Sequence, residues 1–134
     1  MSSSLIQTAN QSQQTVAVNS IIDLGLVQRR FGNNIRMSGD AFELTGAGYY
    51  VVSASITATP TAVGNVTVEM YVNGVPYQGA LGTGSVSVVG NSTNISVITT
   101  VRKGCCDVEA SNITFVLTEG AGVIDNISVR VEKA

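Results

Sequence analysis

The sequence has 134 residues and a formal net charge of −2, and only 12% of its residues are charged. A chain of this length can bury a core of its own, so we expect a single folded head. The slightly acidic balance and the lack of a long Lys/Arg cluster argue against binding to nucleic acid or to an anionic membrane, because both depend on neutralising phosphates.

The first fifteen residues are rich in Ser, Gln, Thr and Asn, with Leu5 and Ile6 as an apolar pair. A segment of this composition is too polar to fold by itself. We therefore expect a polar N-terminal arm over residues 1–15, anchored to a neighbouring protein through Leu5 and Ile6, and a head domain over residues 16–134. The start shows no signal-peptide pattern and no later stretch approaches about 18 apolar residues, so neither secretion nor membrane insertion is expected.

Turn signals recur at short, regular intervals after residue 24, among them FGNN at 31–34, TGAG at 45–48, NG at 73–74 and EGAG at 119–122. Val, Ile and Thr make up about a third of the residues, as in proteins built of β-strands. Between the turns the apolar residues alternate with polar ones, for example in 66–72, 113–117 and 127–131. This pattern predicts an all-β sandwich or jelly roll whose strands each bury one face.

The stretch TGAGYYVVSASITATP at residues 45–60 alternates in the same way but is half-polar on its second face. We expect the even-numbered residues to line the core. The odd-numbered face is small and hydroxylated, and the residues on it that we predict to form a subunit contact are Tyr49, Val51, Ser53 and Ser55. Residues 49–52 and 95–101 carry apolar groups on both faces, which is typical of strands that are central or covered on the outside.

Chemistry that would support catalysis is sparse in this sequence. There is no histidine, and the nine acidic residues are scattered over turns and outward positions, so neither a His-dependent triad nor a paired-carboxylate site is expected. We therefore expect no enzyme activity and no cofactor. A calcium site at Asp40 or Asp107 with nearby carbonyl groups is an open alternative.

The two cysteines, Cys105 and Cys106, are adjacent and cannot join distant strands. We expect two reduced thiols at the start of a strand, one facing inward and one outward. The alternatives are a disulfide between neighbours, which needs strained geometry, and a thiolate metal site shared between subunits, because two cysteines are too few for zinc in one chain.

The order of motifs resembles the tumour-necrosis-factor-like and complement-1q-like superfamily of globular heads. The matching pieces are QTVAVNSIIDL, GNNI, FELTGAGYYVVSASIT, VEMYVNG, NISVITTVRKG, ITFVLTEG and NISVRVEKA. The most specific is the run F-x-L-x-x-x-G-x-Y leading into an aliphatic strand. Its residues form the core signature that we carry over from the family: Phe42, Leu44, Gly48, Tyr50, Val52 and Ile56.

The resemblance implies a jelly-roll β-sandwich of two antiparallel sheets and about ten strands, assembled as a compact homotrimer about a three-fold axis. The alternative is a monomeric sandwich whose odd-numbered face in 45–60 is solvated. The chain departs from the family in lacking a Gly-X-Y stalk. It also has Lys103, Gly104, Cys105 and Cys106 where relatives often have Gly-Asp, so a family calcium site is not carried over.

Two functions follow from the resemblance as hypotheses. The first is a structural and interaction protein on the surface of a bacteriophage virion, as a capsid decoration, fibre head or receptor-binding component, bound to a capsid or tail protein through the arm. The second is a bacterial surface or spore-coat head that binds glycans or host proteins. A sandwich glycosidase is disfavoured, because there is no Trp to stack sugars and no carboxylate pair.

Overall fold

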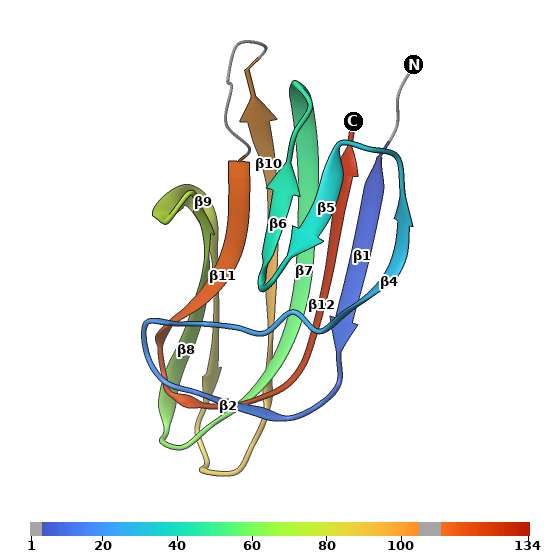
Figure 1. Ribbon diagram of the computed structural model, residues 1–134. Helices are drawn as coiled ribbons and strands as arrows, with labels where there is room; N and C mark the ends of the chain where they lie inside the picture. Colours follow the sequence, from blue (N-terminus) through green and yellow to red (C-terminus); the bar gives the residue numbers. More distant parts are fainter. Residues whose placement is uncertain (1–3, 105–110) are drawn as a thin grey trace.

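The computed structural model describes residues 4–104 and 111–134, and over these ranges the chain forms twelve β-strands in two antiparallel sheets packed face to face (Figure 1). The predicted all-β sandwich is confirmed. It has two more strands than the ten expected, since β2 (Gln14–Val16) and β3 (Ser20–Ile21) are short additional strands. No helix long and apolar enough to cross a bilayer occurs within these ranges.

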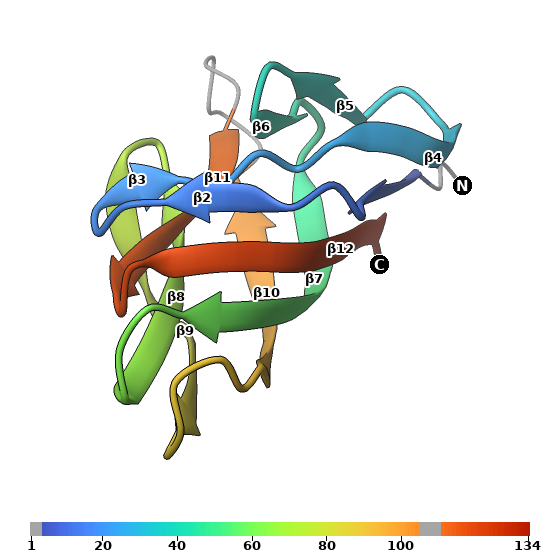
Figure 2. The ribbon, with the colours of Figure 1, turned by 90° about the horizontal axis from the view of Figure 1, so that it is seen from below.

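The first sheet contains, in order, β10 (Thr93–Lys103), β7 (Gly48–Pro60), β12 (Gly122–Lys133), β1 (Leu5–Asn10) and β4 (Leu26–Phe31), with β2 also pairing with β12. The second sheet contains, in order, β5 (Ile35–Ser38), β6 (Ala41–Leu44), β11 (Ser111–Glu119), β8 (Gly64–Val72) and β9 (Val75–Val86), with β3 also pairing with β11. In both sheets, strands that are far apart in the sequence lie next to each other. Figure 2 shows the two layers from below, where β2 and β3 run across the end of the sandwich.

Alternating side chains from both sheets fill the space between them. The central strand β7 contributes Tyr50, Val52 and Ile56, and β6 contributes Phe42 and Leu44, all without exposed surface. These are the apolar residues of the core signature. Their spacing of two places them on one face of each strand, which explains why an alternating sequence forms this sandwich.

The start of β7 is fixed by two residues of the signature. Gly48 has a φ of 142°, a backbone conformation that side chains disfavour, and a Cβ there would lie 2.9 Å from Cε of Lys133. The hydroxyl of Tyr50 donates a hydrogen bond to the carbonyl of Gly46. Burial raises the pKa of Tyr50 above its usual range, so the ring is anchored as a neutral phenol at the point where the strand begins.

The N-terminal segment differs from the expected polar arm. Leu5–Asn10 form β1, which pairs with β12 on one side and with β4 on the other. Ile6 has no exposed surface and belongs to the core, while Leu5 is 8% exposed and held within the sheet, so the pair does not form the anchor of a free arm as expected. The arm assignment is therefore corrected for the described residues of this segment, 4–15: two neighbouring strands supply hydrogen-bond partners that a polar segment can use without an apolar pattern of its own.

Candidate interaction surface

The outer face of β7 and β10 is a nearly uncharged, partly apolar surface. From β7 it presents the predicted contact residues Tyr49, Val51, Ser53 and Ser55, of which Tyr49 is 54% exposed. On β10, Ile98 lies directly opposite Ser53 in the register and is 70% exposed. We call this surface the β7–β10 face and define it by Tyr49, Val51, Ser53, Ser55, Thr57, Asn94, Ser96, Ile98, Thr100 and Arg102.

The composition of the β7–β10 face makes it inexpensive to remove from water. Arg102 is its one charged residue, and most of its other polar groups are hydroxyls, which cost far less to bury than an unpaired charge. The Nδ2 atom of Asn94 donates to Oγ of Ser55 and to Oγ1 of Thr57, both at 3.4 Å. These internal bonds lower the number of polar groups that would need new partners in a contact.

The opposite edge of the same sheet exposes apolar side chains beside two arginines. All six residues of β4 are exposed, including Leu26 at 76% and Phe31 at 53%. An edge strand has unpaired backbone groups that another chain can pair with, although Arg29 and Arg30 place charge on this edge. Exposed apolar side chains on β4 are therefore a second part of the first sheet that is suited to contact with another protein.

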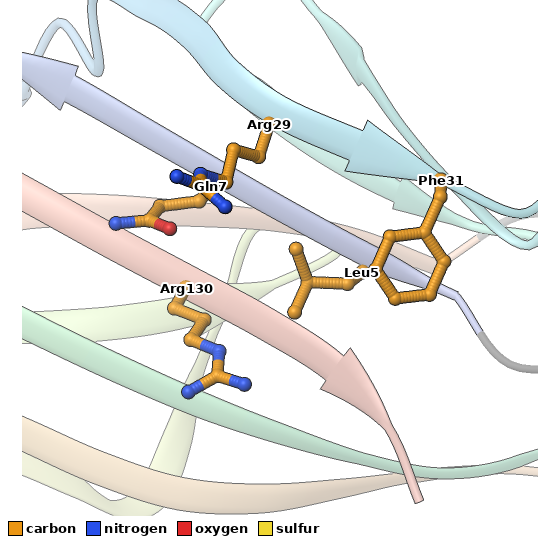
Figure 3. A pocket seen from close by; sticks show the side chains of 5 residues that line it. All are labelled: Leu5, Gln7, Arg29, Phe31 and Arg130. Carbon is orange, nitrogen blue, oxygen red and sulfur yellow. The ribbon is translucent and has the colours of Figure 1, made fainter.

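Between β4 and β12 the outer face of this sheet is hollowed. The hollow has a volume of about 380 Å³ and is lined by Leu5, Gln7, Arg29, Phe31 and Arg130. In the register, Gln7 lies between Arg130 on β12 and Arg29 on β4, and Leu5 lies opposite Phe31. Figure 3 shows Leu5 and Phe31 side by side, with Arg29 beside Gln7 and Arg130 on the next strand.

Sequence reasoning missed Ile98 and, apart from Leu5, the residues of the hollow. Ile98 was detectable, because the alternation of Ile95, Val97 and Val101 puts it among polar residues on the opposite face. The expectation that 95–101 is central or covered outside is wrong for the chain by itself, since β10 lies at an edge of its sheet with Ile98 exposed. The hollow could not be predicted from the sequence, because its residues come from three strands and no single motif specifies how those strands pair.

The alternative calcium site at Asp40 has one carboxylate beside it. Asp40 lies next to Asp23, and partial burial, followed by the charge and hydrogen bonding of Asp23, raises its pKa. Within residues 4–104 and 111–134, no group of three or more His, Cys, Asp or Glu side chains is placed to hold a metal ion. The other candidate, Asp107, and the pair Cys105 and Cys106 lie outside the described residues.

The fold is shared with solved structures of very different sequence. Eiger TNF from S. frugiperda matches with a TM-score of 0.72 at 7% identity, covering 98% of this chain and 91% of that one. The globular domain of zebrafish complement 1qA protein matches with a TM-score of 0.70 at 6% identity, covering 94% of each chain. The PRD1 vertex protein P5 matches with a TM-score of 0.62 at 12% identity, covering 99% of this chain and 96% of that one.

No protein-family model and no curated protein sequence matches the chain. At identities this low the structural matches show the fold alone. They confirm the predicted resemblance at that level: the chain has the jelly roll of the TNF-like and complement-1q-like proteins.

Proposed function

We propose that this protein is a non-enzymatic structural and interaction protein that assembles as a homotrimer and is displayed on the surface of a bacteriophage virion. The observation that supports the trimer is the β7–β10 face. Tyr49 and Ile98 are exposed on it, and only one of its ten residues is charged. The likeness in fold to the vertex protein of phage PRD1 supports the virion as its location.

The arrangement of the first sheet suits a closed ring of three copies. In a ring, each copy contacts the next through two different patches. The β7–β10 face lies at one edge of the sheet and the exposed strand β4 lies at the other. A ring that brings the β7–β10 face of one copy against the Leu26 end of β4 in the next would cover Ile98 and Leu26 together, whereas a monomer leaves both in water.

Attachment to the particle must then use the jelly roll rather than an N-terminal arm. Because Ile6 is in the core and β1 is paired on both sides, the first strand cannot leave the sheet without exposing apolar surface. We place the contact with the capsid or tail protein on a surface of the folded trimer.

Immunogold electron microscopy tests the location. Antibodies raised against the purified chain should label phage particles, and serum depleted with the same protein should not. Gold on the surface of bacterial cells or spores, with bare particles, would contradict the virion role and support a cell-surface head that binds glycans or host proteins.

A further inference from the structure

We propose that the hollow between β4 and β12 is a binding site for a carboxylate attached to an apolar group. It is lined by Leu5, Gln7, Arg29, Phe31 and Arg130, and it lies on β1, β4 and β12 rather than on the β7–β10 face. The inference does not depend on the virion role.

The charge within the hollow is not balanced by the chain itself. The Nη2 atom of Arg130 lies 2.7 Å from Oε2 of Glu132, so this arginine has an acidic partner. Among the described residues, Arg29 has no ion pair and no side-chain hydrogen bond. One positive charge therefore remains for a ligand, and a group with a single negative charge matches it.

The geometry of the polar row favours a carboxylate. Arg29, Gln7 and Arg130 are cross-strand neighbours in the register, so they form a continuous row of N–H donors. The guanidinium of Arg29 offers two parallel donors, which match the two oxygens of a carboxylate, and the amide of Gln7 adds a donor beside it. A phosphate dianion would bring a second charge toward Glu132, which is unfavourable.

The second row of the hollow explains why the ligand should carry an apolar group. Leu5 and Phe31 lie opposite each other two register positions from Gln7 and Arg29, on the same face of the sheet (Figure 3). The other two phenylalanines, Phe42 and Phe115, have no exposed surface, whereas the ring of Phe31 is left in water. An aromatic or aliphatic body lying against Phe31 and Leu5 would cover this ring while its carboxylate faces Arg29.

Titration with phenylacetate, followed by NMR of the ¹⁵N-labelled protein, tests the site. We expect saturable shifts confined to β1, β4 and the end of β12, with a dissociation constant on the order of millimolar for so small a probe. Phenylacetamide, which has the same shape without the charge, should bind at least about tenfold more weakly. No saturable shift with phenylacetate, or equal binding of the amide, would overturn the proposal.

Substitutions test the row of donors and the apolar row of the hollow separately. Arg29→Gln should weaken phenylacetate at least about tenfold, whereas the control Arg36→Gln removes an exposed arginine of β5 in the other sheet and should leave phenylacetate binding unchanged. Phe31→Ser should weaken phenylacetate but leave the weaker binding of acetate unchanged. An equal loss of affinity in Arg29→Gln and Arg36→Gln would show that only general charge matters and would refute a site in the hollow.

The same carboxylate chemistry has two sources, a free small molecule or an acidic side chain of a second copy, and sedimentation distinguishes them. If saturating phenylacetate and Arg29→Gln each lower the assembled mass, the carboxylate comes from a neighbouring copy. If phenylacetate binds with the mass unchanged, the ligand is free. Either result supports the carboxylate site.

Discussion

At the scale of single residues, β7 separates folding from assembly by alternation. Val52 and Ile56 have no exposed surface, whereas Ser53, between them in sequence, points to the other side. Adjacent side chains of a strand point to different faces. A charge is therefore costly at an inward position and tolerated by the folded protomer at the outward position next to it.

Substitutions at adjacent positions of β7 therefore should have different effects on folding. Val52→Asp should prevent folding, because a carboxylate in the core costs several kcal/mol out of a typical total of roughly 5 to 15 kcal/mol. Ser53→Asp should leave the protomer folded. Circular dichroism with urea unfolding checks both, and a Ser53→Asp protein without a cooperative transition would contradict the orientation of β7.

Thr8 is an unusual residue of the core. Its side chain has no exposed surface, and its Oγ1 atom has no hydrogen-bond partner among residues 4–104 and 111–134. An unsatisfied buried hydroxyl costs about 1 to 3 kcal/mol. Thr8→Val, which keeps the shape, should therefore raise the free energy of unfolding by about 1 kcal/mol. Urea unfolding measures this, and an unchanged or lower midpoint would indicate that the hydroxyl is satisfied in solution.

The neighbouring carboxylates Asp23 and Asp40 predict a pH dependence. Because partial burial and then Asp23 raise the pKa of Asp40 in the folded state, the folded protein holds this proton more tightly than the unfolded chain. Stability is therefore present below the unfolded pKa and is lost as the pH rises through the folded pKa.

Asp40→Asn removes the loss of stability that accompanies ionisation of Asp40. The variant should have a slightly higher urea midpoint than wild type at pH 7 and the same midpoint at pH 3, with a small difference because Asp40 is exposed. Asp23→Asn removes only the second cause of the raised pKa of Asp40 and should give a smaller gain, and the double variant should add little to Asp40→Asn. A gain that is equal at both pH values would exclude a titration effect.

At the scale of elements, the long alternating strands were predictable and β1 was not. Strands β7 and β11, and β12 from Ile127 to Val131, carry apolar or small residues at every second position, which is enough to place them in a sheet. Strand β1 has the sequence LIQTAN, in which Thr8 stands at an inward position, so its composition indicates an arm. Its structure is imposed by β12 and β4, a tertiary effect that local composition does not carry.

Deleting residues 2–12 tests this reassignment. The deletion removes β1 from between β12 and β4 and takes Ile6 out of the core, so the truncated chain should fail to fold. A deletion of residues 2–3, which precede β1, is the control and should fold normally. One-dimensional proton NMR distinguishes the two, and dispersed signals from the longer deletion would restore the arm interpretation.

At the scale of the whole molecule, the fold could be predicted from the order of its motifs, whereas the surfaces depend on strand pairing. The contact residues Tyr49, Val51, Ser53 and Ser55 came from one alternating stretch. Their neighbour Ile98 became part of the same surface only through the pairing of β10 with β7. To predict a surface that several strands form together, the register of their pairing must be known, and local sequence patterns do not determine that register directly.

The mass of the protein in solution, measured by sedimentation equilibrium, tests the central claim most directly. We expect wild type to have about three times the monomer mass of 13.9 kDa at micromolar concentration, and Ser53→Asp and Ile98→Asp to be folded monomers, because each places a carboxylate in the β7–β10 face. Asn112→Asp, on the exposed surface of β11 in the other sheet, should keep the wild-type mass. A folded wild type at 13.9 kDa, or a trimer in both face variants, would contradict assembly through this surface.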